Sequence, residues 1–222
     1  MALCHKVRQG SLLIEELWSK EKMEEHSNRC PWCGRDPIYR QYHDEVWGRP
    51  VANEQELFEK LCLDGQQAGL SWITILKKQH SYQAAYDQFD PERIVQYDDK
   101  KISELLQNPG VIRNKLKVQS VIKNARAFLA LKNEGRCFSE FLWNFVDGQP
   151  VQNEFQSMGE VPVSNAASEA MSKALKRLGF TFVGPTICYA FMEAVGMVND
   201  HLVSCDQWRE CHELTGKFIL PS

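Results

Sequence analysis

Residues that commonly bind metals gather at two places near opposite ends of the chain. Cys30, Cys33 and His43 lie in the N-terminal part, while His201 and Cys205 are four positions apart near the C-terminus. A spacing of four places two side chains on one face of a helix, and thiolates with imidazoles suit tetrahedral zinc. A metal bound by both groups would join the two ends of the chain. Such a site would leave no open coordination position for catalysis.

The residues alone leave other accounts of these side chains open. Cys30-Pro-Trp-Cys33 has the spacing of a dithiol redox pair, although no thioredoxin-like pattern of strands and helices surrounds it. A buried cysteine often behaves as a small hydrophobic residue, and a lone histidine is more often packed than metal-bound. Five candidates compete for four positions, and spacing does not say which one is spare.

The bulk composition indicates one soluble domain. The 222 residues are 43% hydrophobic and 25% charged, with a net charge of -3. Glu15 and Glu16 interrupt the apolar start, so it does not resemble a signal peptide, and the apolar stretch around Glu193 is too short to span a membrane. We therefore expect a cytoplasmic protein with no membrane partner, whose eight cysteines are thiols or ligands rather than disulfides. Residues 29–222 would form the domain, and 1–28 an extension with an amphipathic helix over 11–25.

Helical periodicity dominates, so the predicted fold class is all-α. Asn53 should cap a helix whose apolar residues recur at helical spacing, and Ser164 should cap another that Gly179 stops. GFTFVG at 179–184 is the one real strand candidate. The helix that Ser164 caps covers 165–178, and the other predicted helices cover 71–89, 101–107, 112–132, 138–146 and 186–197.

A basic helical hairpin is predicted around Asn108-Pro109-Gly110-Val111. Glycine supplies the backbone freedom for the turn, and free amide groups at the start of the second helix would face a docked phosphate. No acid occurs between Glu104 and Glu134. Nucleic-acid backbone is a natural partner for such a surface, although ordinary solvated lysines are the plainer account. The interval holds Arg113, Lys115, Lys117, Lys123, Arg126 and Lys132.

One acid stands in apolar surroundings, in LCLDGQQAGLSW at 61–72. Asp64 there either caps a helix end or serves a site, since a buried unpaired charge is costly. Local pattern alone favours capping.

Five motifs in order settle the comparison with known families. They are CPWCGRDPIYRQYHDEVWG, LCLDGQQAGLSWITILKK, NPGVIRNKLK with NARAF, KALKRLGFTFVGPTICYAFMEAVG and NDHLVSC. Together they closely resemble the DNA-3-methyladenine glycosylase I family, from about Arg29 to beyond Cys205. The resemblance implies a helix-hairpin-helix DNA glycosylase fold, a structural zinc ion, and a bacterial-type cytoplasmic enzyme, expected to be a monomer. It also implies hydrolytic excision of 3-methyladenine from alkylated double-stranded DNA, with the free base as product.

The resemblance also implies roles for individual residues. It gives the zinc ligands as Cys30, His43, His201 and Cys205, with Cys33 as the spare thiol. The base-pocket aromatics fall on Trp32, Tyr39, Tyr42 and Trp72. The pocket acid falls on Asp64, where the family usually has glutamate, and Ala190 stands where a serine is common. From the hairpin, the expected DNA contacts are Asn108, Gly110, Arg113, Lys115 and Lys117.

These residue types fit the chemistry. Methylation at N3 makes adenine a cation, which aromatic faces and a buried carboxylate favour over the neutral base. No lysine appears among the pocket motifs as a Schiff-base nucleophile, so we expect a monofunctional hydrolase without strand cleavage. The alternatives are a diverged homologue that binds DNA or damage with altered base specificity or without excision, and a zinc- or thiol-based redox or interaction protein.

Overall fold

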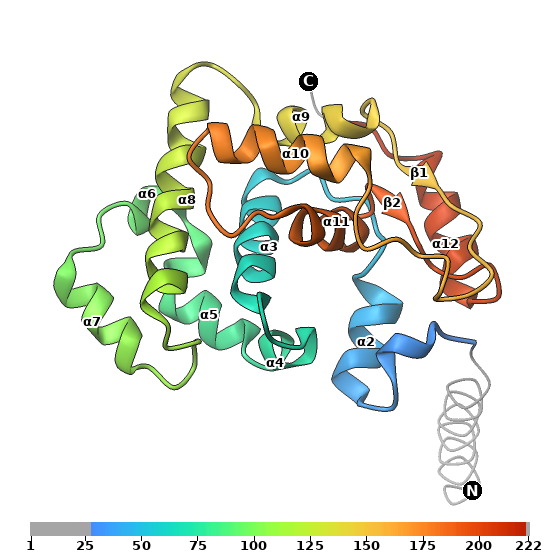
Figure 1. Ribbon diagram of the computed structural model, residues 1–222, viewed down its shortest axis with the longest axis horizontal. Coiled ribbons are helices and arrows are strands. Elements are labelled where there is room, and N and C mark those ends of the chain that lie inside the picture. Colours follow the sequence, from blue (N-terminus) through green and yellow to red (C-terminus); the bar gives the residue numbers. More distant parts are fainter. Residues whose placement is uncertain (1–27, 221–222) are drawn as a thin grey trace, which may run out of the picture.

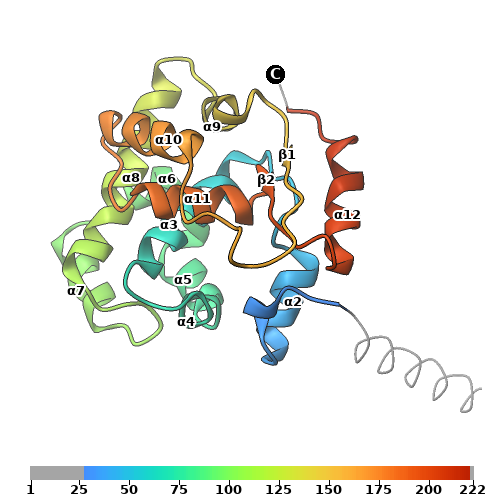
Figure 2. The same cartoon turned by 45° about the vertical axis from the view of Figure 1, so that its right-hand side comes forward.

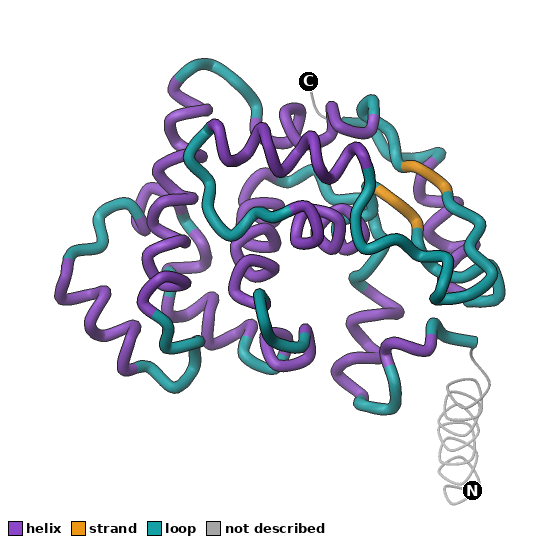
Figure 3. The backbone as a smooth tube through the Cα atoms, in the orientation of Figure 1, coloured by secondary structure: helices purple, strands orange, loops and turns teal. Residues whose placement is uncertain are grey.

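The computed structural model describes residues 28–220, and within them the chain is almost entirely helical (Figures 1 and 3). This confirms the all-α expectation. The predicted helix over 11–25 lies outside the described residues. The helices are η1 Pro31–Cys33, α2 Pro37–Glu45, α3 Glu54–Gln67, α4 Trp72–Leu76, α5 Gln79–Ala85, η2 Asp87–Phe89, α6 Pro91–Ile94, α7 Asp99–Gln107, α8 Lys115–Asn133, α9 Phe138–Trp143, η3 Asn144–Val146, α10 Ala166–Arg177, α11 Pro185–Ala194 and α12 Asp206–Thr215.

Helix α3 runs through the middle of the molecule and packs against α8 and α11 (Figures 1 and 2). The predicted cap is confirmed: Asn53 Oδ1 accepts hydrogen bonds from the backbone amides of Gln55 and Glu56. From Leu57 to Gln66 most of the helix is buried. Asp64 therefore lies deep in the structure, near the C-terminal end of the central helix.

The first part of the described chain, with α2, and the last helix, α12, lie together at one side of the molecule (Figure 2). A two-residue parallel pair joins β1 Val151–Gln152 to β2 Val198–Asn199. This pair is the only sheet among the described residues. It holds the loop that follows η3 beside the segment that leads into α12.

The strand prediction for 179–184 is wrong. Phe182 has a φ of 57°, which breaks an extended run, and side chains satisfy the neighbouring backbone. Asn124 donates to the Thr181 carbonyl and accepts from its amide, while Ser172 Oγ donates to the Val183 carbonyl. Gly65 permits this segment to cross α3, because a Cβ there would lie 3.1 Å from Phe182 Cβ.

Two details of the helix predictions also need correction. Asn165, not Ser164, caps α10 through a reciprocal pair of hydrogen bonds with Ser168. The predicted helix over 71–89 is divided into α4, α5 and η2, with left-handed backbone at 87–89. The stop at Gly179 is confirmed, since its φ is 95° just beyond the end of α10.

The predicted hairpin is present as α7, a turn over 108–114, and α8 (Figure 1). Asn114 caps α8 by accepting from the Lys117 amide. Lys78, the residue just before α5, supports the turn: its Nζ donates to the Pro109 carbonyl at 2.6 Å. Glycine is required at 110, because a Cβ there would lie 2.8 Å from Ser81 Cβ.

None of the helices within residues 28–220 has the length and apolar character needed to span a membrane.

Asn124 provides a test of how the fold is fixed. Replacing Asn124 with alanine leaves the Thr181 amide and carbonyl without their partners, which should cost about 1–3 kcal/mol of unfolding free energy. Urea denaturation followed by circular dichroism measures this. Lys123→Ala, at the exposed neighbouring position on α8, should change stability little; equal stability of both variants would contradict the assigned role.

Candidate functional site

Four donor atoms from distant parts of the chain meet in one buried cluster. The sulfur atoms of Cys30 and Cys205 and one ring nitrogen each of His43 and His201 all lie within 4.8 Å of one another. Cys205 Sγ lies 3.5 Å from His201 Nδ1 and 3.6 Å from His43 Nε2. Ligands about 2.0–2.3 Å from a tetrahedral ion lie roughly 3.5 Å apart, so the group could bind a metal. Cys33 is outside the cluster, and its thiol donates to the Cys30 carbonyl.

Neighbouring groups orient the two imidazoles toward this cluster. His43 Nδ1 is 2.7 Å from Asp44 Oδ1, and Asp44 is also paired with Arg29. His201 Nε2 is 3.2 Å from the Trp47 carbonyl oxygen. In each ring the nitrogen that points away from the cluster therefore has a partner, as is usual for metal-bound histidines. A hydrogen bond from the Cys30 thiol, aided by both imidazoles, lowers the pKa of the Cys205 thiol well below its usual range.

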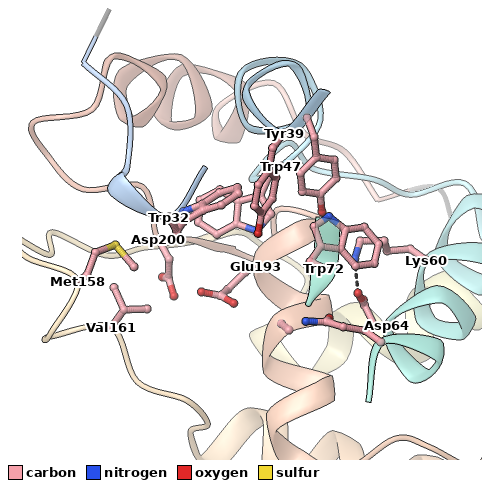
Figure 4. A pocket seen from close by; sticks show the side chains of 13 residues that line it. Trp32, Tyr39, Trp47, Lys60, Asp64, Trp72, Met158, Val161, Glu193 and Asp200 are labelled. Atoms are coloured by element: carbon pink, nitrogen blue, oxygen red, sulfur yellow. Dashed lines mark hydrogen bonds and ion pairs between the residues drawn. The ribbon is translucent and has the colours of Figure 1, made fainter. Parts of the chain in front are cut away.

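A cavity of about 240 Å³ lies beside the cluster (Figure 4). The segment that supplies Cys30 and His43 also supplies part of its aromatic wall: Trp32 lies 5.1 Å from His43, measured between ring centroids. All four expected aromatics, Trp32, Tyr39, Tyr42 and Trp72, line the cavity, and so does Asp64. The structure thus brings together every residue expected in the pocket.

Asp64 is fully buried, and a lysine one helical turn earlier pairs with it. The Lys60 ammonium contacts Asp64 Oδ1 and lies 3.8 Å from the centroid of the Trp72 ring (Figure 4). Burial raises the pKa of Asp64 and lowers that of Lys60, and their mutual attraction opposes both shifts. The premise that no lysine accompanies the pocket residues is therefore wrong.

Two buried polar atoms in the cavity lining have no hydrogen-bond partner among the described residues: Asp64 Oδ2 and Trp72 Nε1. Orphaned polar groups are rare in folded proteins because each is costly to bury. One is an acceptor and the other a donor. A planar ligand that offers both an N–H group and a ring nitrogen would satisfy them.

The cavity has two further acids that the sequence did not indicate, Glu193 and Asp200 (Figure 4). Asp200 accepts hydrogen bonds from the Tyr189 hydroxyl and the Asn153 amide. Burial, together with neighbouring Asp200, raises the pKa of Glu193 well above its usual range. Trp47 and Ala190 also line the wall.

The expected hairpin residues divide into two groups. Arg113 and Lys115 are exposed at the start of α8. Lys117 is buried, and its ammonium donates to the carbonyls of Gln66 and Ala68 at 2.7 Å each. The geometry therefore corrects the expectation that Lys117 contacts DNA, because its side chain holds the loop after α3 instead.

The remaining hairpin and loop residues have local roles. Asn108 Oδ1 accepts from the Gly110 amide and so shapes the turn. Gln66 is buried and donates to the Lys117 carbonyl. Gly69 has a φ of 76° and lets the loop turn toward Trp72. Leu70 beside it is 41% exposed, an apolar side chain that the sequence pattern did not single out.

The fold combines a basic helical hairpin with an aromatic cavity that holds a buried acid. This combination is typical of DNA glycosylases, which bind a base after it leaves the duplex. The family model for methyladenine glycosylase matches residues 32–209. A DNA-3-methyladenine glycosylase from Haemophilus influenzae is 49% identical over 179 residues, which cover 81% of this chain and 97% of that protein. DNA-3-methyladenine glycosylase 1 from Escherichia coli is 49% identical over 80% of this chain and 95% of its own length.

Solved structures of 3-methyladenine DNA glycosylase I also match the chain. A crystal structure of 3-methyladenine DNA glycosylase I matches with a TM-score of 0.80 at 51% identity, covering 81% of this chain and 98% of that one. A single-substitution variant of such an enzyme, crystallised with 3-methyladenine, matches with a TM-score of 0.78 at 35% identity, covering 81% and 96%. The chain belongs to the methyladenine glycosylase family.

The two nearby cysteines provide a matched test of the cluster. Cys205→Ala removes a donor and should reduce bound metal from about one ion per chain to a small fraction, with lower thermal stability. Cys33→Ala removes a buried thiol that lies outside the cluster and should retain the metal. Elemental analysis of both purified proteins measures this, and full metal content in Cys205→Ala would refute the ligand assignment.

Proposed function

We propose that this protein excises 3-methyladenine from alkylated double-stranded DNA by base flipping and hydrolysis of the N-glycosidic bond. The observation that carries the proposal is the buried acid Asp64 among four aromatic side chains in one cavity, in a chain of the methyladenine glycosylase family. A solved relative was crystallised with 3-methyladenine itself.

Charge is the basis of base selection in this proposal. The methylated adenine in DNA is a cation, and contact with the faces of Trp32, Tyr42 or Trp72 would stabilise it by about 0.5–2 kcal/mol for each ring. Asp64 Oδ2 would accept from the exocyclic amine, and Trp72 Nε1 would donate to a ring nitrogen, so both orphaned atoms gain partners. Normal adenine offers the same hydrogen bonds but no charge.

The bond cleavage needs little acid assistance. When the bond between C1′ and the base breaks, its electron pair goes to the base, which leaves as neutral 3-methyladenine. The positive charge that develops on the sugar is stabilised by the DNA phosphates and by the Asp64 carboxylate. Water then adds at C1′ and loses a proton to solvent. Lys60 is paired as an ammonium with Asp64 in the free protein, and an ammonium is not a nucleophile, which opposes a Schiff-base step and favours a monofunctional enzyme.

The hairpin is the proposed DNA-binding surface. Free amide groups in the turn at Gly110 and at the start of α8 would contact phosphates, with Arg113 and Lys115 beside them. Asn108 contributes by shaping the turn. Lys117 is not part of this surface, since both of its hydrogen bonds hold the loop after α3.

The metal that suits Cys30, His43, His201 and Cys205 is zinc. Two thiolates and two imidazoles form a closed tetrahedral set, which is typical of a structural ion. Bound there, the ion would fix the segment that supplies Trp32, Tyr39 and Tyr42 to the cavity. It would take no part in the reaction.

Asp64 is the decisive position for activity. Asp64→Asn keeps an oxygen that accepts from Lys60 but removes the charge, and should lower kcat/KM for 3-methyladenine release by roughly 10- to 100-fold. Chromatography of the bases released from methylated duplex DNA measures this, and gel electrophoresis of the same samples should show intact strands. Glu45→Gln, at an exposed acid on α2, should retain full activity.

The wild-type result decides between excision and binding without excision. No released 3-methyladenine would overturn the proposal, and tight damage-dependent binding without release would support the diverged binding protein instead. Unchanged activity in Asp64→Asn would exclude Asp64 from base recognition. Asp64→Glu, measured in parallel, shows whether the shorter acid changes which alkylated base is released.

The hairpin prediction concerns salt dependence. Removing Arg113 and Lys115 together should weaken duplex binding uniformly across sequences, and should lower the slope of log K against log salt by about 0.9 for each phosphate that is no longer neutralised. Fluorescence anisotropy at several salt concentrations measures the slope. Lys173→Ala, at an exposed position on α10, should leave it unchanged, and an equal drop in this control would argue against a hairpin interface.

A further inference from the structure

Lys60 uses the two features of the cavity that a cationic base would need. Its ammonium pairs with one oxygen of Asp64 and lies 3.8 Å from the centroid of the Trp72 ring (Figure 4). An ammonium at that distance occupies the ring face, so a base ring cannot stack on the same face while Lys60 remains there. The free protein thus contains a cation in the place where the ligand cation would bind.

The ion pair between Lys60 and Asp64 follows from their spacing on α3, and both side chains are largely buried. Lys60 precedes Asp64 by four residues on α3, so their side chains share one helix face. The Lys60 side chain is 15% exposed and that of Asp64 is 1% exposed. A pair removed from water to this degree is less screened than a surface pair.

Lys60 also has a second acidic neighbourhood available. Besides the cavity, it lines an adjoining groove whose lining includes Glu56 and Glu59. Glu56 is exposed and lies four residues before Lys60, and a glutamate N-terminal to a lysine at this spacing is the favourable order on a helix. Rotation of the Lys60 side chain toward the groove would replace one carboxylate partner by another. Glu59 is already bonded to Gln79 and Gln83, so Glu56 is the available partner.

We propose that Lys60 is a resident cation that holds the subsite formed by Asp64 and the Trp72 face until the flipped base displaces it toward Glu56, so that every base must overcome the same ion pair before it binds. A cationic base replaces the charge that leaves, so Asp64 stays compensated. A neutral base that displaces Lys60 leaves the buried Asp64 carboxylate without a charged partner. The affinity for the neutral base is therefore much lower than that for the cationic base. The inference rests on the proposed function, because it assumes that the cavity receives the methylated base.

Binding of two small bases tests the displacement directly. The probes are 3,9-dimethyladeninium, a permanent cation, and 9-methyladenine, which has the same ring system without the charge. Calorimetry with the zinc-loaded full chain should show that Lys60→Met tightens both probes by the same factor, roughly tenfold, because one ion-pair cost is removed for both. Lys60→Arg, which restores a cation, should return both affinities toward the wild-type values.

The other outcomes overturn the proposal. If only the cationic probe tightens, Lys60 stays in place and merely repels it. If both probes weaken or neither changes, Lys60 is a binding donor or a structural residue. Released-base analysis on methylated DNA is run separately with the wild-type protein, so a failure of the proposed function is distinguishable from a failure of displacement.

Glu56 supplies the second variant. Glu56→Gln should weaken the cationic probe several-fold in the wild-type background and have no effect in the Lys60→Met background. A residue outside the cavity with a purely structural role would not show this dependence on Lys60. Equal effects of Glu56→Gln in both backgrounds would refute the displaced position. Thermal denaturation of each variant confirms that the affinities refer to folded protein.

Discussion

The position of the aromatic wall depends on the buried group of two thiols and two imidazoles. Its donors come from the first described residues and from the segment just before α12, and they meet within 4.8 Å. Trp32 lies between the two N-terminal cysteines, and Tyr42 immediately precedes His43 in α2. Short helices such as η1 and α2 have little stability of their own, so a bound ion would supply the energy that orders them.

The second constraint is charge balance in the cavity. Asp64 is buried on the central helix, and an unpaired carboxylate there would be costly. Lys60 compensates it in the free protein, and a cationic base would do so in the complex. In the proposed function the same electrostatic requirement would therefore act in the free protein and in the choice of ligand. Burial and the neighbouring Asp200 raise the pKa of Glu193 in the same cavity, which opposes a further negative charge there.

Motif and periodicity identified the large features correctly. The Asn53 cap, the α7–α8 hairpin, the stop at Gly179 and the grouping of Asp64 with the four aromatics are present as expected. These features are local, or are carried by motifs whose spatial relation the family resemblance supplies. The predictions that were wrong concern residues whose conformation depends on tertiary contacts. GFTFVG alternates like a strand, but its backbone is bonded by Asn124 and Ser172 from other helices.

Lys117 and Lys60 show the same limit for charged side chains. Each resembles an ordinary solvated lysine on a helix, and composition cannot reveal that Lys117 is directed at two backbone carbonyls. For Lys60 a signal did exist, because it precedes an acid in apolar surroundings by one helical turn. The spacing allows the pair, but only the positions of α3 and Trp72 show that it lies inside the cavity.

The length of the acid and the presence of the lysine belong to one question. A glutamate at position 64 would carry its carboxylate roughly 1.5 Å further from the backbone than aspartate does. With aspartate the carboxylate stays close to α3, where a lysine one turn earlier covers one oxygen and leaves the other without a partner. A base that enters this cavity must therefore either reach past the ammonium or replace it. The position of Lys60 over the Trp72 face favours replacement, because stacking and ion pairing become available to the base in the same movement.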